Sequence, residues 1–533
     1  MPTLTSGQRQ SILQVLGALL SGLLLLLAFP QYGSEMGLDG LVWVGLVPLF
    51  LSSVGTGLRR GLLLGWCTGL VLESSGFCWI LLAIRRFTGL PSPVAALIFS
   101  LWVLYASIPW ALLGGLLGAS GRSSSLSRAL LCWVSIEGLF PRLFPWHLGG
   151  ALHGREWIVQ CADLLGASGL TALVFLWNAL VFTVVGWLRG KRGLPYGLAV
   201  VSVVLLAAAL LYGRSRLEYV TGVTGEAPSL RVLLVQGALD PAQRSDRGLE
   251  HYISETEKLL ESSGGPDLIV WPEGADQYPF NLTPRESPWL FHKGHVPPER
   301  LIRRITAPLV AGSAGYARGR LPEFSNVAFF LEPGKQPFFY EKNRRILFGE
   351  HVPCIGWLPE SWRREIFQNI GTLWPGEGNP PMRLGNATFK NLICYEAVLP
   401  GYICESSRGA DFLVNITEDV WYGQTAHISQ HVSVLILRVV ENRTPLVRCA
   451  NMGPSGVIHA TGRFERGKKV FAPEGVWSEL RPRSLPTVYR SWGRHLPLAI
   501  LVLVGLEWIV RRLRRANLAK ADLAGRQGKK IAL

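Results

Sequence analysis

Eight long apolar stretches constrain this chain more than any other feature of its sequence. They cover residues 12–29, 38–55, 61–84, 93–118, 126–146, 164–188, 194–213 and 494–510. Each is about long enough to cross the ~30 Å hydrocarbon core of a bilayer as one helix. Because 49% of the 533 residues are hydrophobic, the chain is too apolar for an ordinary soluble protein. We therefore expect a multi-span α-helical membrane bundle.

Two features of these stretches allow more than one interpretation. A cleaved signal peptide is the alternative for residues 12–29, but the stretch is long for one, lacks a small-residue cleavage site and precedes further spans. Glu137 interrupts residues 126–146, and Glu73 lies within residues 61–84. Since charged side chains are costly in lipid, each glutamate either serves a function or makes contacts inside the bundle.

The uneven distribution of lysine and arginine sets the predicted topology. With a cytoplasmic N-terminus, sixteen of them lie on the cytoplasmic side and four lie in the opposite short loops. The sixteen are Arg9, Arg59, Arg60, Arg122, Arg128, Arg189, Lys191, Arg192, Arg511, Arg512, Arg514, Arg515, Lys520, Arg526, Lys529 and Lys530. The four are Arg85, Arg86, Arg142 and Arg155. Many of the basic residues behind the formal charge of +16 flank spans, so we do not expect nucleic acid as a partner.

Residues 214–493, which this topology exports, alternate short apolar runs with polar, helix-compatible stretches. The expected strands are residues 229–235, 268–270, 309–312, 326–331, 391–394, 412–416 and 446–450. The expected helices include residues 247–261 and 427–442. This alternation predicts an α/β domain. The chain thus divides into a seven-span bundle (1–213), an exported domain (214–493), and a final span with a basic cytoplasmic tail (494–533).

Three of the apolar runs end at chemically reactive side chains. Glu273 follows the run at residues 268–270, Lys342 ends an aromatic run, and Cys394 closes the run at residues 389–393. A cysteine in such a run is more often inert core than a nucleophile. The set and order of Glu, Lys and Cys nevertheless resemble the nitrilase superfamily. In that superfamily glutamate acts as base, lysine stabilises the tetrahedral intermediate and cysteine attacks the carbonyl.

Seven spans, an exported nitrilase-like domain and a closing span together resemble the bacterial apolipoprotein N-acyltransferase family over nearly the whole chain. The resemblance implies an αββα sandwich for the exported domain, which would face the periplasm from the bacterial inner (cytoplasmic) membrane. It implies an enzyme that takes an acyl chain from a phospholipid, expected to be phosphatidylethanolamine, onto its cysteine as a thioester. The chain then passes to the α-amino group of the N-terminal diacylglyceryl-cysteine of an apolipoprotein. The catalytic triad falls on Glu273, Lys342 and Cys394, and no cofactor is implied.

Further residues match positions that the family uses around its site. The supporting residues are Glu350, Tyr395 and Glu396. Glu350 is expected to position Lys342. Residues that also fit the pattern are 438–445, Arg448, Asn451 and Gly453. For these we favour a structural interpretation, a helix with i,i+3 charge pairs that leads into a core strand.

Two loops depart from the family's pattern. Residues 345–347 are Arg-Ile-Leu in place of Leu-Val-Pro, which adds a charge and removes a proline that would stiffen the loop. Residues 418–422 are Glu-Asp-Val-Trp-Tyr in place of Asn-Asp-Ala-Trp-Phe. The triad is intact, so these departures concern the loops beside it and the preference for acyl chain or acceptor.

Residues 355–367 are rich in apolar and aromatic side chains but follow no long period, and they include Trp357 and Trp362. Tryptophan is enriched at membrane interfaces, so these two residues are candidates for admitting lipid to the site. The alternative is a satellite cluster packed on the sheet.

The cysteine and histidine spacings indicate neither a disulfide framework nor a metal centre. The eight cysteines are scattered and form no CxxC pair. His427 and His431 stand four residues apart, a spacing that can bind zinc, but Ile428 occupies the position where a zinc protease carries its glutamate. We expect no bound metal.

Two other functions share part of this evidence. A membrane-anchored carbon-nitrogen hydrolase, an amidase or nitrilase, would use the same triad but would need only one anchoring span. A transporter or receptor with a non-catalytic domain would explain the spans but not the presence of Glu273, Lys342 and Cys394 together. Acyl transfer from phospholipid to a diacylated lipopeptide distinguishes the three.

Overall fold

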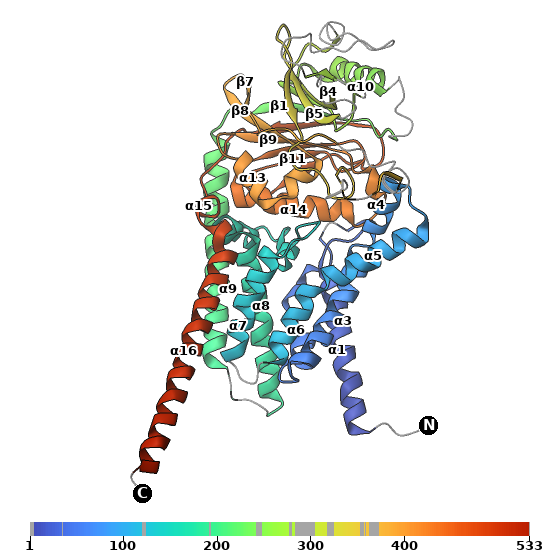
Figure 1. Ribbon diagram of the computed structural model, residues 1–533. Coiled ribbons are helices and arrows are strands. Elements are labelled where there is room, and N and C mark those ends of the chain that lie inside the picture. Colours follow the sequence, from blue (N-terminus) through green and yellow to red (C-terminus); the bar gives the residue numbers. More distant parts are fainter. Residues whose placement is uncertain are drawn as a thin grey trace.

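The protein has two parts, a helical bundle that contains both chain termini at its far end and a two-sheet domain at the opposite end (Figure 1). The structure is a computed structural model. It describes residues 5–34, 36–119, 124–190, 193, 195–240, 248–276, 280–282, 304–316, 324–351, 357, 359–361 and 373–531.

The bundle is formed by most of the predicted apolar stretches. Its helices are α1 (Ser6–Ala28), α2 (Val47–Ser53), α3 (Leu58–Gly76), α4 (Trp79–Thr88), α5 (Ser92–Ala106), α6 (Ile108–Gly118), α7 (Ser124–Leu139), α8 (Ala162–Leu188), α9 (Tyr196–Gly225) and α16 (Leu496–Ile531). Within the described residues, four helical segments are long and apolar enough to cross a membrane: α1, α5 with α6, the segment that ends with α8, and α9. A fifth is the pair α3 and α4, bent by 57°.

Besides the bent pair α3 and α4 and the pair α5 and α6, three predicted spans differ from a single long apolar helix. Residues 38–55 form a 3-10 turn, Asp39–Trp43, followed by the short helix α2. Helix α7 has only 16 residues, and it carries Glu137, which accepts hydrogen bonds from Leu148 N (2.6 Å) and Thr171 Oγ1 (2.6 Å). Helix α16 leaves the bundle and continues as a basic helix to Ile531.

The predicted domain boundary at residue 213 falls inside a helix, because α9 extends to Gly225.

Glycines allow α3 and α6 to cross at very short range. A Cβ atom on Gly114 would lie 2.2 Å from the carbonyl oxygen of Gly61, and one on Gly65 would lie 2.1 Å from the carbonyl oxygen of Trp110. Small residues at such crossings let helix backbones pack directly against each other in lipid. This crossing fixes the position of α4 and α5, which continue from these two helices towards the sheets (Figure 1).

We predict that Gly114→Val destabilises the bundle, because the new side chain would overlap the backbone of α3. Overpacking of this kind costs about 1–3 kcal/mol. The melting temperature of the detergent-purified protein should fall by several degrees. Gly222→Val in α9 is the control, since no atom lies within 4 Å of its Cβ position. Equal stability of the two variants would contradict the close crossing.

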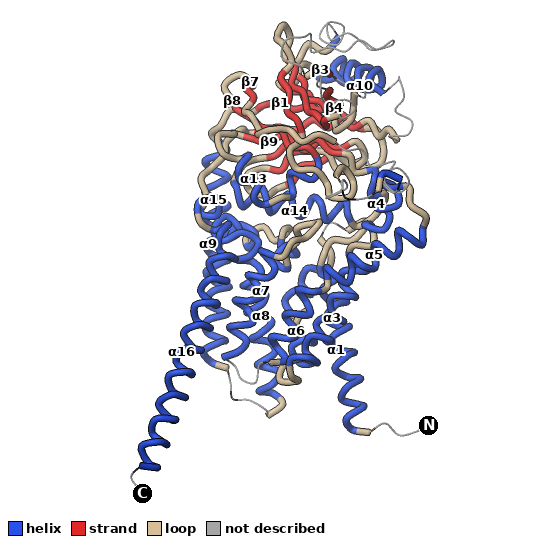
Figure 2. The backbone as a smooth tube through the Cα atoms, viewed as in Figure 1, coloured by secondary structure: helices blue, strands red, loops and turns tan. Residues whose placement is uncertain are grey.

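The domain contains two mixed sheets packed face to face (Figure 2). The first sheet contains β1 (Leu230–Gln236), β2 (Leu268–Val270), β3 (Phe280–Asn281), β4 (Leu309–Tyr316), β5 (Ser325–Leu331), β6 (Phe338–Glu341) and β13 (Glu474–Leu480). The second contains β7 (Met382–Leu384), β8 (Ala387–Ile393), β9 (Phe412–Thr417), β10 (Leu446–Ala450), β11 (Gly456–Ile458) and β12 (Phe464–Arg466). Their strand orders are β13-β1-β2-β4-β5-β6, with β3 paired to β4, and β12-β11-β10-β9-β8-β7.

Helices cover the outer faces of both sheets. Helix α10 (Gly248–Ser263) packs Leu249, Tyr252 and Ile253 on the first sheet. Helices α13 (Pro400–Ser406) and α14 (His427–Asn442) cover the second sheet and separate it from the bundle (Figure 1). The predicted αββα sandwich joined to a multi-span helical bundle is therefore confirmed.

One buried ion pair and one buried hydrogen bond attach α14 and the residue after it to the bundle. Arg443 donates from Nε to Asp163 Oδ2 at 3.0 Å, and Glu441 Oε1 accepts from Ala167 N at 2.9 Å. Arg438 pairs with Glu441 at 2.6 Å, which is the i,i+3 contact that we favoured from the sequence. Because these side chains are almost fully buried, α14 is held between the two parts of the protein.

Candidate active site

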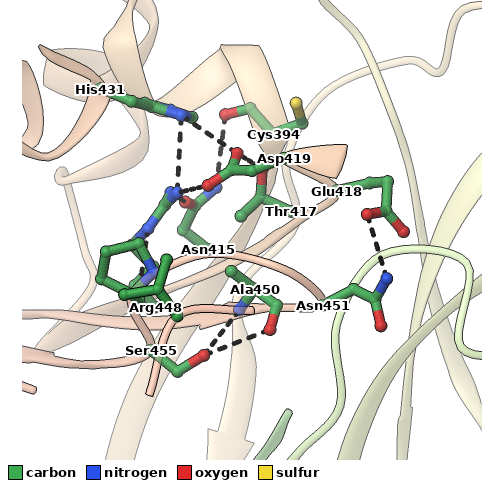
Figure 3. Close-up of polar contacts among 12 residues, drawn as sticks. Cys394, Asn415, Thr417, Glu418, Asp419, His431, Arg448, Ala450, Asn451 and Ser455 are labelled. Atoms are coloured by element: carbon green, nitrogen blue, oxygen red, sulfur yellow. Dashed lines mark hydrogen bonds and ion pairs between the residues drawn. The ribbon is translucent and has the colours of Figure 1, made fainter. Parts of the chain in front are cut away.

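Cys394 lies where β8 ends and a 3-10 turn, η6 (Cys394–Val398), begins. Its φ is +51°, a left-handed conformation that costs an L-residue about 1–2 kcal/mol. Asn415 of β9 donates from Nδ2 to the carbonyl oxygens of Leu392 (3.1 Å) and Cys394 (3.4 Å). These contacts hold the strained turn and present the thiol at the edge of the core between the sheets (Figure 3).

Strand directions bring two of the three expected residues, Glu273 and Lys342, to one edge of the first sheet. Strands β4, β5 and β6 are successively antiparallel, and β2 is parallel to β4, so β2 and β6 point the same way. Glu273 follows β2 and Lys342 follows β6, and the carboxyl ends of such strands meet at one edge of a sheet. Gly312 of β4 allows the turn at Glu273 to approach, because a Cβ there would lie 2.6 Å from Glu273 Cα.

Lys342 is a buried cation between two carboxylates. Its Nζ lies 2.6 Å from Glu350 Oε1 and 3.5 Å from Glu273 Oε1. Burial lowers the pKa of the Lys342 amine, but the charges of Glu350 and Glu273 raise it, and the net pKa lies above its ordinary value. Lys342 therefore stays charged, and Glu350 is placed to orient it. Glu350 itself is fixed by the amide of Ile346, which donates to its Oε2 at 2.9 Å.

The carboxylate of Glu273 is held by donors on both oxygens. Asn326 donates from Nδ2 to Oε1 at 2.7 Å, and the backbone amide of Glu418 donates to Oε2 at 2.9 Å. Burial raises the pKa of Glu273 above the ordinary value of a glutamate, while the charge of Lys342 lowers it. A carboxyl with a raised pKa is a stronger base than an exposed one.

The thiol of Cys394 needs such a base. Burial raises its pKa well above the ordinary value, and the charge of Glu273 raises it further, while Lys342 lowers it. The sulfur is therefore a protonated thiol at rest. Since the thiolate is the nucleophile, the site can react only when a base takes the proton.

Glu396 connects the cysteine turn to the lysine loop. Its Oε2 accepts from the amide of Ile393 (2.8 Å), directly before the nucleophile, and from the hydroxyl of Tyr340 (2.6 Å). Its Oε1 accepts from the amides of Asn343 (2.7 Å) and Arg344 (2.9 Å), directly after the lysine. Glu396 therefore joins the segment after Lys342 to the segment before Cys394 through one buried carboxylate.

A largely apolar cavity of about 320 Å³ connects Cys394 to the bundle. The residues that line it include Trp79, Ala83, Phe87, Ile98, Trp102, Phe144, Ile346, Phe348, Cys394, Tyr395, Tyr422, His427 and His431. Helices α4 and α5 thus contribute one side, and the catalytic domain contributes the other. Tyr395 belongs to this wall, where its hydroxyl donates to the carbonyl oxygen of Leu143 at 2.7 Å.

Helix α4 also holds the loop that fixes the expected base. Arg86 Nη1 donates to the carbonyl oxygen of Val420, and Phe87 stacks on Trp421 with ring centroids 5.1 Å apart. Glu418, in the same loop, supplies the amide that binds Glu273. A helix of the bundle therefore positions a carboxylate in the domain.

A buried polar network supports the same loop from below (Figure 3). Arg448 of β10 pairs with Asp419 Oδ2 and donates from Nη1 to Asn415 Oδ1 at 2.9 Å. Sequence analysis interpreted Arg448 as structural and did not identify Asn326, Asn415 or Asp419. The sequence feature that could have identified these residues is that each is a polar side chain next to, or within, an otherwise apolar strand.

The structure describes only one of the two tryptophans that are candidates for admitting lipid. Trp357 is 87% exposed, so its side chain does not pack in a satellite cluster on the sheet. Trp362 and most of residues 355–367 lie outside the described residues. The assignment of these tryptophans to lipid access stays a prediction.

We predict that Arg86→Ala slows acylation of Cys394 by about fivefold, because a lost hydrogen bond of about 1 kcal/mol loosens the loop that holds Glu273. The measurement is the single-turnover rate of thioester formation. Arg85→Ala removes the same charge one residue earlier on α4, whereas the hydrogen bond to the loop comes from Arg86. If both variants slow thioester formation to a similar extent, the cause is the lost positive charge and not the hydrogen bond of Arg86.

We predict that Asn326→Ala moves the acid limb of the pH profile to higher pH. The reactive form requires ionised Glu273, so the rate of thioester formation falls as pH decreases through the pKa of this carboxyl. The Asn326 hydrogen bond lowers that pKa, and its removal raises it further above the ordinary value. An unchanged acid limb would show that another group controls it.

Family models match both parts of the chain. The Apolipoprotein N-acyltransferase N-terminal domain family matches residues 21–180, and the Carbon-nitrogen hydrolase family matches residues 234–469. The solved structure of Saccharomyces cerevisiae Nit3, a nitrilase superfamily member, is 17% identical over 48% of this chain and 90% of that chain, with a TM-score of 0.37.

Curated relatives cover nearly the full length. An apolipoprotein N-acyltransferase from Geobacter metallireducens is 30% identical over 89% of this chain and 91% of that relative. One from Chlorobaculum tepidum is 27% identical over 93% of this chain and 96% of that relative. One from Agrobacterium fabrum is 31% identical over 84% of this chain and 86% of that relative. This chain therefore belongs to the apolipoprotein N-acyltransferase family.

Proposed function

We propose that this chain transfers an acyl chain from a phospholipid, through a thioester on Cys394, to the α-amino group of the N-terminal diacylglyceryl-cysteine of an apolipoprotein. The observation that carries this proposal is the apolar cavity, which has the nucleophile on one side and α4 and α5 of the bundle on the other. An acyl chain can reach the thiol through such a cavity without crossing water. A small-amide hydrolase would not need an apolar wall made by membrane helices.

The first half-reaction uses the triad in the following way. Glu273 takes the proton from Cys394 Sγ, and the thiolate attacks the carbonyl carbon of the phospholipid ester. The oxygen of the tetrahedral intermediate gains a negative charge, which the fixed ammonium of Lys342 stabilises. The carbon–oxygen bond to the glycerol then breaks, and Glu273 returns the proton to the leaving lysophospholipid. The product is an acyl thioester on Cys394.

The second half-reaction reuses the same groups. The free amine of the apolipoprotein attacks the thioester carbonyl, Glu273 accepts the amine proton, and Lys342 again stabilises the oxyanion. The carbon–sulfur bond breaks, and the thiolate recovers a proton from Glu273. The apolar cavity excludes water, which would otherwise hydrolyse the thioester.

We further propose phosphatidylethanolamine as the donor and the bacterial inner membrane as the location, with the catalytic domain on the periplasmic side. The loop charges support this orientation, because the basic side is the one on which both termini are predicted to lie. The arrangement in Figure 1 is compatible with it, since both termini lie at the end of the bundle opposite the sheets.

Purified protein incubated with acyl-labelled phosphatidylethanolamine and a diacylated lipopeptide tests the proposal. We expect a labelled thioester on the wild type and label on the lipopeptide amine. Cys394→Ser should form neither product, because oxygen is a poorer nucleophile without a matched base. Hydrolysis of small amides without acyl transfer would instead indicate a carbon-nitrogen hydrolase.

We predict that Ala83→Phe separates the acyl cavity from the thiol chemistry. Ala83 lines the cavity on α4, so a phenyl ring there occupies space that the acyl chain needs. Thioester formation from phospholipid should fall at least about tenfold, a barrier increase of about 1.4 kcal/mol, while alkylation of Cys394 by iodoacetamide should change little. Ala96→Phe on the exposed side of α5 is the control. Equal loss in both assays would mean that the variant disturbs the triad.

A further inference from the structure

Two histidines and one aspartate form a buried cluster in the wall of the same cavity. One ligand atom from each of Asp419, His427 and His431 lies within 4.8 Å of the other two. The histidines are on the first turn and a half of α14, and Asp419 is on the loop before the 3-10 turn Val420–Tyr422. The sequence spacing of the histidines offered only two ligands, and the fold supplies the third.

The histidines have unused hydrogen-bonding atoms. Nδ1 of His427 and Nε2 of His431 are buried and form no hydrogen bond within the part of the chain that the structure describes. Both residues are at most 3% exposed. A buried polar atom without a partner costs about 1–3 kcal/mol, so the unpaired Nδ1 of His427 indicates a ligand. On His431 the nitrogen that faces Asp419 is Nδ1.

The carboxylate is oriented in the way that a metal ligand requires. Asp419 Oδ2 pairs with Arg448, whereas Oδ1 accepts from Thr417 Oγ1 at 3.2 Å and lies 3.4 Å from His431 Nδ1 (Figure 3). Ligating carboxylates are commonly held by such second hydrogen bonds. Arg448 uses one oxygen and leaves Oδ1 facing the histidine, but its Nη2 also lies 3.5 Å from His431 Nδ1, so its positive charge reduces the affinity for any cation.

From this geometry we propose that Asp419, His427 and His431 form a binding site for a divalent transition-metal ion of the zinc class. Two imidazoles and one carboxylate are a ligand set that Zn²⁺ binds in proteins, with the fourth position open. At bond lengths of about 2.0–2.1 Å, the ligand atoms of a tetrahedral ion lie about 3.4 Å apart. The observed separations are close enough that small side-chain rotations complete the site.

The ion would act on the loop beside the triad. It would join Asp419 to the start of α14 and so fix the loop whose Glu418 amide binds Glu273. It would also occupy the cavity wall next to Cys394. The placement of the site in an acyl-binding cavity rests on the proposed function, but metal binding is measured without substrate. Failure of one proposal is therefore distinguishable from failure of the other.

The test uses the full-length detergent-purified protein and Co²⁺ or Zn²⁺ alone as the probe. After desalting, we expect about one ion per chain by elemental analysis, the visible absorption of tetrahedral Co²⁺, and a higher melting temperature with Zn²⁺. His427→Gln and His431→Gln should each weaken binding at least about tenfold. Cys394→Ser should retain the ion.

His459→Gln is the matched control, because His459 lies between β11 and β12 and pairs with Glu465 at 3.1 Å. It should bind metal like the wild type. If the wild type retains no ion, or if the His427 and His431 variants retain as much as His459→Gln, the site does not exist. Loss of the ion in Cys394→Ser would assign it to the thiol and overturn the three-ligand site. The wild-type and Cys394→Ser results remain decisive even if a histidine variant fails to fold.

Discussion

The site depends on one buried ammonium group. Lys342 is almost inaccessible to water and is held between Glu350 and Glu273. Removing one partner of a buried ion pair costs about 3–5 kcal/mol, because the remaining charge has no compensation. The three side chains therefore hold each other in place, and the general base cannot move away without exposing a charge. In the proposed mechanism, the same cation lowers the barrier for the oxyanion and keeps the base in position.

Glu396 extends this constraint to the nucleophile. Four donors converge on its carboxylate, two of them from the residues directly after Lys342 and one from the residue directly before Cys394. The left-handed φ of Cys394 is unfavourable alone, so it needs such fixed surroundings. The two catalytic segments come from different sheets, and a buried carboxylate between them replaces a direct backbone connection.

The positions of Glu273, Lys342 and Cys394 at strand ends, and most of the sheet, could be predicted because each depends on local pattern. Strands β2 and β10 and helix α14 have the bounds expected from apolar runs and their stops. The rest depends on contacts distant in sequence. Arg86 and Val420 are 334 residues apart, and no periodicity relates them. The second predicted span was wrong as one long helix, since residues 38–55 break after the turn Asp39–Trp43. Hydropathy measures apolar length but not where a helix stops.

The need for so large a bundle follows from where the cavity lies. Its walls include Trp79 and Phe87 of α4, Trp102 of α5, and Phe348 of the loop after Lys342. That loop is one of the two that depart from the family pattern, and Arg345 within it donates to the carbonyl oxygen of Leu373 at 2.7 Å. In this chain the contact restrains the loop, a role that the proline of the family pattern would otherwise have. Neither the bundle nor the domain forms this cavity alone, so the cavity exists only when both parts are packed together.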